Sequence, residues 1–122
     1  MYSFTFICTI ILQMKAHLKQ ILKFRDDRDW KQFHSAKNLA ISLSLEANEV
    51  LELFQWTKSG NLPKEARQDL EDELADVYAF LLLLANSTGV DLNKAFKTKM
   101  KKNEAKYPIG KSKGKSTKYT KL

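Results

Sequence analysis

Apolar side chains recur every three or four positions in four segments of the chain, a pattern typical of amphipathic helices. The first predicted helix is short and ends near the charged residues 26–29. The four apolar stripes are Leu18, Ile21, Leu22 and Phe24; Leu39, Leu43, Ala47, Val50 and Phe54; Leu70, Leu74, Val77, Leu81 and Leu84; and Leu92, Ala95, Phe96 and Met100. No segment alternates with period two for long, so the pattern predicts an all-α fold, a four-helix bundle.

Residues with strong positional preferences mark the ends of these helices. Ser35 and Asp91 suit the N-caps of the second and fourth helices, and Pro63 suits the first turn of the third. Gly89 suits the C-terminal cap of the third helix, and Pro108 stops the fourth. The second helix is expected to end before Ser59-Gly60-Asn61.

Residues 77–85 read VYAFLLLLA and are apolar on every side of the predicted helix. A helix of this kind is buried all round. One small domain hardly has enough other chain to surround it. We therefore expect this helix to pack across a subunit interface, in a homodimer or in a homotetramer built from such dimers.

The N-terminal residues 1–13 are apolar but shorter than the roughly 20 residues of a membrane-spanning helix. They lack the basic start and the cleavage site of a signal peptide. Two explanations stay open: translation starts at Met14, or the segment adds a strand or helix to the core. The predicted organisation is an apolar extension (1–13), a helical domain (14–108) and a basic tail (109–122), with no membrane partner.

Composition and charge narrow the function classes. The 122 residues suffice for one domain, and a single cysteine, Cys8, excludes an internal disulfide framework and a cysteine zinc site. A reducing, cytoplasmic setting is the default expectation. From residue 94 onward there are 11 Lys and one acid, whereas residues 1–93 carry a net charge of −3. Such a basic end suits nucleic acid, a membrane surface or a phosphorylated small molecule.

Two pairs of carboxylates on neighbouring helices are the strongest sign of chemistry. Glu46 and Glu49 form an ExxE pair on the second predicted helix, and Glu73 and Asp76 form an ExxD pair on the third. Residues three apart are neighbours on a helix surface, and a short loop can bring two antiparallel helices face to face. Four carboxylates without His or Cys suit Mg²⁺, or Mn²⁺, rather than Zn²⁺. The alternative is a solvated acidic face.

Further residues are candidates for substrate binding, but a structural role would also explain each of them. One face of the fourth predicted helix carries Lys99, Asn103, Lys106 and Tyr107, which could contact phosphate or sugar. The same residues also suit a soluble, lysine-rich helix end favoured by the helix dipole. Aromatic and imidazole side chains near the acidic helices could stack on a base or simply fill the core; they are Trp30, Phe33, His34 and Trp56.

Three runs carry a resemblance to a known family: FHSAKNLAISLSLEANEVLELFQW, EDELADVYAFLLLLANSTGVDL and KMKKNEAKYP. From about Arg25 to the C-terminus the chain resembles the MazG-like all-α nucleoside triphosphate pyrophosphohydrolases, in particular their dCTP-pyrophosphatase branch. The resemblance implies Mg²⁺-dependent cleavage of (deoxy)nucleoside triphosphates to monophosphate and pyrophosphate, a nucleotide house-cleaning activity on dCTP-like or modified nucleotides. It also implies a homodimer or homotetramer.

The resemblance also assigns roles to single residues. It implies that Glu46, Glu49, Glu73 and Asp76 hold the metal and that Glu49 orients or deprotonates the attacking water. It implies phosphate and sugar contacts from Lys99, Asn103, Lys106 and Tyr107, and a nucleotide pocket lined by Trp30, His34, Lys37, Asn38 and Trp56.

The chain departs from the family pattern at four positions. Lys37 stands where relatives often have Arg, and Asn48 replaces a small Gly. Phe80 and Ile21 stand where close relatives can place Tyr and His near the base, which leaves the base preference open.

Two alternative hypotheses assign the chain a non-enzymatic function. One is a non-enzymatic helical module that binds nucleic acid or nucleotide through its basic C-terminal region, although no recognition helix with base-reading residues is evident. The other is a regulatory dimer that binds a nucleotide without cleaving it, which has less need of all four carboxylates.

Overall fold

The computed structural model describes residues 4–58 and 60–122, and for residues 4–8 and 10 it describes the backbone alone. All regular elements in this part of the chain are helical, so the predicted all-α class is confirmed. The elements are α1 (Phe4–Asp26), α2 (Ala36–Glu52), α3 (Arg67–Thr88), α4 (Leu92–Lys106) and α5 (Ile109–Ser112), with short 3-10 helices η1 (Trp30–Phe33), η2 (Lys64–Ala66) and η3 (Tyr119–Lys121). Residues 1–3, the side chain of Cys8, and Ser59 of the expected helix-ending turn lie outside the described part.

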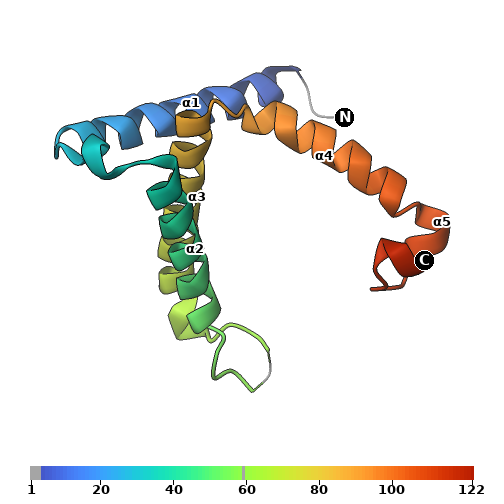
Figure 1. Ribbon diagram of the computed structural model, residues 1–122. Coiled ribbons are helices and arrows are strands. Elements are labelled where there is room, and N and C mark those ends of the chain that lie inside the picture. Colours follow the sequence, from blue (N-terminus) through green and yellow to red (C-terminus); the bar gives the residue numbers. More distant parts are fainter. Residues whose placement is uncertain (1–3, 59) are drawn as a thin grey trace. The chain divides into compact units, whose positions relative to one another are not determined.

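The chain forms two compact units, residues 1–88 and 89–122. In the first unit α2 and α3 lie side by side as a hairpin, which is the most extensive helix contact, and α1 packs against α3 (Figure 1). His17 of α1 and Tyr78 of α3 meet in this contact, with Nδ1 3.2 Å from the phenolic oxygen. The second unit contains α4, α5 and η3.

The predicted caps are found at both helices where they were expected. The Ser35 hydroxyl accepts a hydrogen bond from the backbone N–H of Asn38 (3.2 Å), and the Asp91 carboxylate accepts one from that of Lys94 (3.0 Å). These bonds satisfy N–H groups that have no partner inside the helix. Gly89, just after α3, has φ +69°, a left-handed conformation that glycine adopts without strain.

The buried residues of α3 match the predicted stripe only in part, since Leu70, Val77 and Leu84 of that stripe are half-buried. Leu39 of α2 is buried together with Leu82, Leu83 and Ala85 of α3. From the predicted stripe, Leu74 and Leu81 are 50% and 37% exposed. Because this part of α3 is apolar all round, its periodicity could not specify which of its side chains are buried most deeply.

The first helix is longer than predicted. α1 begins at Phe4 and continues through the boundary at residue 14 to Asp26. Much of the apolar N-terminal segment is therefore helical, but Leu12 in it is 59% exposed, so its addition to the core stays a prediction, as does a translation start at Met14. The placement of a domain boundary at residue 13 stays a prediction.

Two residues of α4 contradict the expected inward stripe. Phe96 and Met100 are 66% and 39% exposed. The other regular elements in their unit are the short α5 and η3, which offer little surface to cover them. Among the described residues no single helix is long and apolar enough to span a membrane, although the segments 64–88 and 92–106 pass that test as a bent pair.

Candidate metal centre and adjoining pocket

The α2–α3 hairpin brings three of the four predicted carboxylates together. Glu46 and Glu49 of α2 and Glu73 of α3 each place a carboxylate oxygen so that all three oxygens lie within 4.8 Å of one another. Glu46 and Glu73 are half-buried and Glu49 is exposed. A spacing of three residues on α2 gives two neighbouring side chains on one face, and the antiparallel partner supplies the third.

Asp76, the fourth predicted residue, stands at the edge of this acidic cluster, which we define as Glu46, Glu49 and Glu73. Its oxygen is not within the 4.8 Å group, yet its charge acts on both Glu46 and Glu73. Asp76 also lines the cavity described below, so it connects the acidic cluster to that cavity.

The crowding of these acids changes their titration. Desolvation, then the charges of Glu49 and Asp76, raise the pKa of Glu46 above its ordinary value. Desolvation likewise raises the pKa of Glu73, followed by the charge of Glu49 and a hydrogen bond that protonated Glu73 donates to Glu49. Ionising all three acids is therefore costly unless a cation lies between them. Three carboxylates with no nitrogen or sulfur donor form a set that suits a hard divalent metal ion.

Beside the cluster lies a cavity of about 400 Å³ between α1, η1 and α3, which we call the α1–α3 pocket. Its volume is in the range of small-molecule sites. It is lined by Gln20, Ile21, Phe24, Arg25, Trp30, His34, Asp76, Ala79, Phe80 and Leu83. Three predicted nucleotide-pocket residues, Trp30, His34 and Phe80, therefore come together here, next to Asp76.

The walls of the α1–α3 pocket combine aromatic surface with a few polar groups. Trp30 and Phe24 pack edge to face, with ring centroids 5.8 Å apart. His34 Nδ1 is buried and has no hydrogen-bond partner in the described part of the chain. Burial and the nearby Arg25 charge lower the pKa of His34, so the imidazole is neutral at pH 7 and offers one donor and one acceptor.

Sequence reasoning missed several residues of this pocket, among them Phe24 and Arg25. Arg25 is nearly buried, with its side chain 13% exposed, and it pairs with Asp26 at 2.7 Å. Phe24 was predicted only as a core residue of the first helix. No sequence pattern signals either role, since both residues lie in a charged helix end whose surroundings depend on how α1 crosses α3.

Three predicted pocket residues lie elsewhere on the first unit. Asn38 donates a hydrogen bond from its side chain to the carbonyl of Phe33 (2.9 Å), which ties η1 to the start of α2. Lys37 is exposed on the same turn. Trp56 is 86% exposed beside a shallow hollow in the loop after α2. None of the three lines the α1–α3 pocket.

The four predicted phosphate and sugar contacts all belong to the second unit. Lys99, Asn103 and Lys106 lie on α4, and Tyr107 follows its last residue. The carbonyl of Asn103 accepts a hydrogen bond from the N–H of Tyr107 (2.8 Å). Tyr119 of η3 packs edge to face on Tyr107 at 5.8 Å and lies 4.7 Å below the Lys106 ammonium. Tyr119, absent from the predicted set, thus orders this helix end.

Comparison with known proteins decides the family. The sequence model of the MazG-like family matches residues 41–122, more than half of the chain. The chain belongs to the MazG-like family. It is 42% identical over 106 residues to dCTP pyrophosphatase 1 of Rattus norvegicus and 41% identical over 106 residues to that of Homo sapiens, in each case over 82% of this chain.

The MazG-like chain spans 62% of the length of those two relatives. Its fold is similar to the crystal structure of a pyrophosphatase from Archaeoglobus fulgidus, with a TM-score of 0.70 and 40% sequence identity. That match covers 79% of this chain and 93% of the archaeal one. The acidic cluster lies inside the family match, whereas Trp30 and His34 precede it.

Proposed function

We propose that this MazG-like chain hydrolyses (deoxy)nucleoside triphosphates, dCTP-like or non-standard, to nucleoside monophosphate and pyrophosphate, and so cleans the nucleotide pool. One observation carries the proposal: three carboxylate oxygens within 4.8 Å of one another border, through Asp76, a cavity of about 400 Å³ with an aromatic wall. The names of the relatives, dCTP pyrophosphatase and pyrophosphatase, support the reaction class.

The acidic cluster and Asp76 fit a divalent metal site. The cluster has only carboxylate donors, and its raised pKa values reflect repulsion that a cation relieves. Such a set favours Mg²⁺, with Mn²⁺ as a substitute. When bound, Mg²⁺ supplies positive charge that neutralises the triphosphate.

The chain's own residues perform the proton transfer. Glu49, the exposed member of the acidic cluster, accepts a proton from a water molecule whose oxygen forms a bond to phosphorus. The bond between the α-phosphate and the bridging oxygen breaks, and pyrophosphate leaves with that oxygen. We assign the pocket between α1 and α3 to the base, with Trp30 as a stacking surface and neutral His34 as a hydrogen-bonding group.

Similarity to the family assigns further substrate contacts to residues outside the α1–α3 pocket. Lys99 and Lys106 would contact phosphate, Asn103 and Tyr107 the sugar or phosphate, and Lys37, Asn38 and Trp56 the nucleotide. Phe80 and Ile21 in the α1–α3 pocket offer no hydrogen-bonding side-chain group. Discrimination between bases therefore depends on the polar side chains beside them, Gln20, Arg25 and His34. A cytoplasmic location accompanies this activity.

Pyrophosphate release from a panel of nucleotides tests the proposed function. We expect release with Mg²⁺ from dCTP and modified deoxynucleoside triphosphates, with rates that differ between bases, because the α1–α3 pocket contacts the base. Monophosphates should be inert, since they contain no anhydride bond. Absence of release from every triphosphate, together with a gel shift of DNA at physiological salt, would instead favour the nucleic-acid module.

We also propose that the chain assembles as a homodimer or homotetramer. Large apolar side chains of the hairpin are 37–66% exposed in the single chain, namely Leu45, Leu51, Leu74 and Leu81. Exposed apolar side chains of this kind are suited to burial against a second copy of the chain. Replacing Leu81 by Glu should convert the wild-type oligomer to a 14.1 kDa monomer in light scattering. Val90→Glu, at a 48% exposed site outside the hairpin, is the matched control. A monomeric wild type would contradict the proposal.

A further inference from the structure

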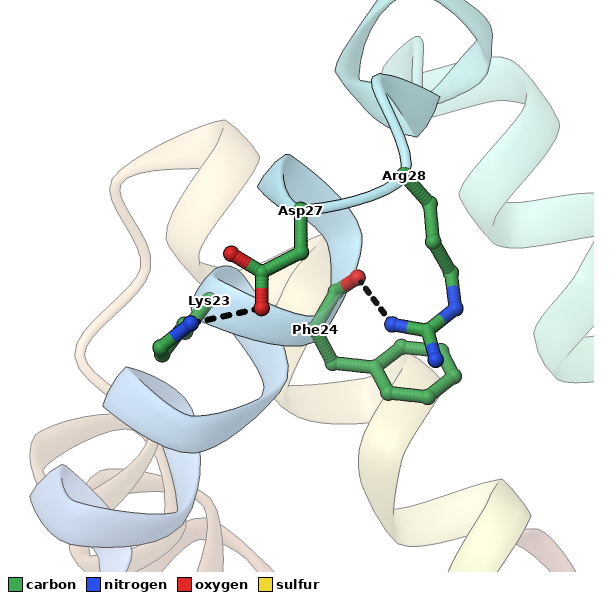
Figure 2. Close-up of polar contacts among 4 residues, drawn as sticks. All are labelled: Lys23, Phe24, Asp27 and Arg28. Carbon is green, nitrogen blue, oxygen red and sulfur yellow. Dashed lines mark hydrogen bonds and ion pairs between the residues drawn. The ribbon is translucent and has the colours of Figure 1, made fainter.

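The aromatic wall of the α1–α3 pocket, formed by Phe24 and Trp30, is contacted by a residue that does not line the pocket. Arg28 follows the end of α1 and folds back onto its last turn (Figure 2). Its Nη1 donates a hydrogen bond to the carbonyl of Phe24 (3.0 Å), and its guanidinium carbon lies 3.6 Å from the centroid of the Phe24 ring. The same carbon is 5.9 Å from the ring of Trp30.

One guanidinium therefore stacks on the Phe24 ring and lies within cation–π range of the Trp30 ring. Phe24 and Trp30 already pack edge to face, but they are 49% and 44% exposed, so packing around them is incomplete. A planar cation over an aromatic face adds attraction and restricts the ring. The hydrogen bond to the Phe24 carbonyl fixes the guanidinium relative to the helix that carries the ring.

The backbone conformation of Asp29, between Arg28 and Trp30, places the Trp30 ring against Phe24. Asp29 adopts φ 54° and ψ 31°, a left-handed conformation that is unfavourable for a residue other than glycine. The Gln32 side-chain amide donates to both the carbonyl of Asp29 (2.9 Å) and its carboxylate (3.0 Å). On the other side of the corner, Lys23 pairs with Asp27 at 2.6 Å (Figure 2). Polar contacts on both sides thus stabilise the turn that places Trp30 against Phe24.

We propose that Arg28 is a positioning residue that fixes the Phe24–Trp30 wall of the α1–α3 pocket and thereby sets how strongly the enzyme binds and distinguishes the base of its nucleotide substrate. The inference rests on the proposed function, since it assigns the α1–α3 pocket to the base. It predicts an effect on the base-bearing part of the substrate alone, because Arg28 touches the wall and none of the carboxylates.

The test compares Arg28→Gln and Arg28→Lys with Arg67→Gln, which removes an exposed arginine that pairs with Glu71 at the start of α3. With Mg²⁺ present, Arg28→Gln should raise KM for the preferred deoxynucleoside triphosphate about tenfold and leave kcat within about twofold. Arg28→Lys keeps the charge but not the planar stack, so its KM should fall in between. Inorganic tripolyphosphate, which has no base, should inhibit all variants equally.

Tryptophan fluorescence tests the order of the Phe24–Trp30 wall directly. Trp30 and Trp56 are the two tryptophans of the chain, so in a Trp56→Phe background the emission comes from Trp30. Arg28→Gln in that background should shift the emission to longer wavelength and weaken its response to a non-hydrolysable deoxynucleoside triphosphate analogue.

Two results would overturn the inference: kinetic constants of Arg28→Gln equal to those of Arg67→Gln, or an equal loss of affinity for nucleotide and tripolyphosphate, which would indicate a general structural role. The proposed function fails in a different way. If the wild type released no pyrophosphate, the change in Trp30 emission on binding of the analogue, compared with and without Arg28→Gln, would still test the role of Arg28.

Discussion

Replacing Glu49 by Gln is expected to lower kcat for pyrophosphate release about 10³-fold, which is the range for loss of a general base. The amide has the shape of the carboxylate but accepts no proton at neutral pH. The substitution also replaces one of the three carboxylates, whose oxygens lie within 4.8 Å of one another, by a neutral amide, so Mg²⁺ affinity should fall in the same variant. Stopped assays of pyrophosphate release at saturating Mg²⁺ measure the first effect, and titration calorimetry with Mg²⁺ measures the second.

The loss should not come from unfolding. The charge of Glu49 contributes to the raised pKa of both Glu46 and Glu73, so its removal relieves repulsion in the metal-free protein. Glu49→Gln should therefore keep the wild-type oligomer and melt at the wild-type temperature or above it. Glu71→Gln is the matched control, because Glu71 is an exposed acid on α3 that pairs with Arg67 at 2.7 Å. Its activity should remain that of the wild type.

Asp76→Asn extends the argument to the edge of the cluster. Asp76 acts electrostatically on Glu46 and Glu73 and also lines the α1–α3 pocket. Its replacement should reduce activity by orders of magnitude in a folded oligomer. Near-normal rates in either Glu49→Gln or Asp76→Asn would show that the metal and base assignments are wrong.

The acidic cluster was predictable from sequence because its geometry is local. A spacing of three residues places Glu46 beside Glu49 on any α-helix, and the next helix along the chain is its antiparallel neighbour. The N-caps at Ser35 and Asp91 were predictable for the same reason, since each bond reaches only three residues along the chain. Local rules therefore sufficed for the two N-caps and for the pairing of Glu46 with Glu49, but not for the start of α1 at Phe4.

The pocket depends on contacts that no local rule specifies. Phe24 and Arg25 of α1 meet Asp76 and Phe80 of α3 across about fifty residues of sequence. Their meeting depends on where α1 crosses the hairpin, and the all-apolar part of α3 gave several equivalent faces for that crossing. The backbone of Asp29 adds to the difficulty, because a left-handed aspartate is uncommon and nothing in the sequence requires it.

Removal of the metal should abolish activity and also lower stability in a way that depends on pH. With EDTA in excess, pyrophosphate release should fall to background, and added Mg²⁺ should restore it. At pH 8 saturating Mg²⁺ should raise Tm by about 5 to 10 °C, the shift expected when a ligand well above its Kd binds only the folded state of a small domain. Differential scanning fluorimetry with and without Mg²⁺ measures this shift.

The sign of the pH effect follows from the raised pKa values of Glu46 and Glu73. Because the folded state binds these protons more tightly than the unfolded state does, the two groups favour folding below about pH 4.5, the ordinary glutamate pKa. That stability is lost as pH rises through their folded-state pKa values, and above those values the metal-free protein bears the repulsion between the ionised acids. Mg²⁺ binds the ionised acids and competes with protons. Its effect on Tm should therefore be larger at pH 8 than at pH 5.

Glu46→Gln provides the decisive comparison for this linkage. It removes a donor of the cluster and a charge that raises the pKa of Glu73, so the Mg²⁺-induced rise in Tm should largely disappear. The metal-free variant should be at least as stable as the metal-free wild type at pH 8, since the repulsion is smaller. Glu71→Gln should retain the full Mg²⁺ effect. An equal response to Mg²⁺ in Glu46→Gln and Glu71→Gln would place the metal away from the acidic cluster and would remove the basis for the proposed chemistry.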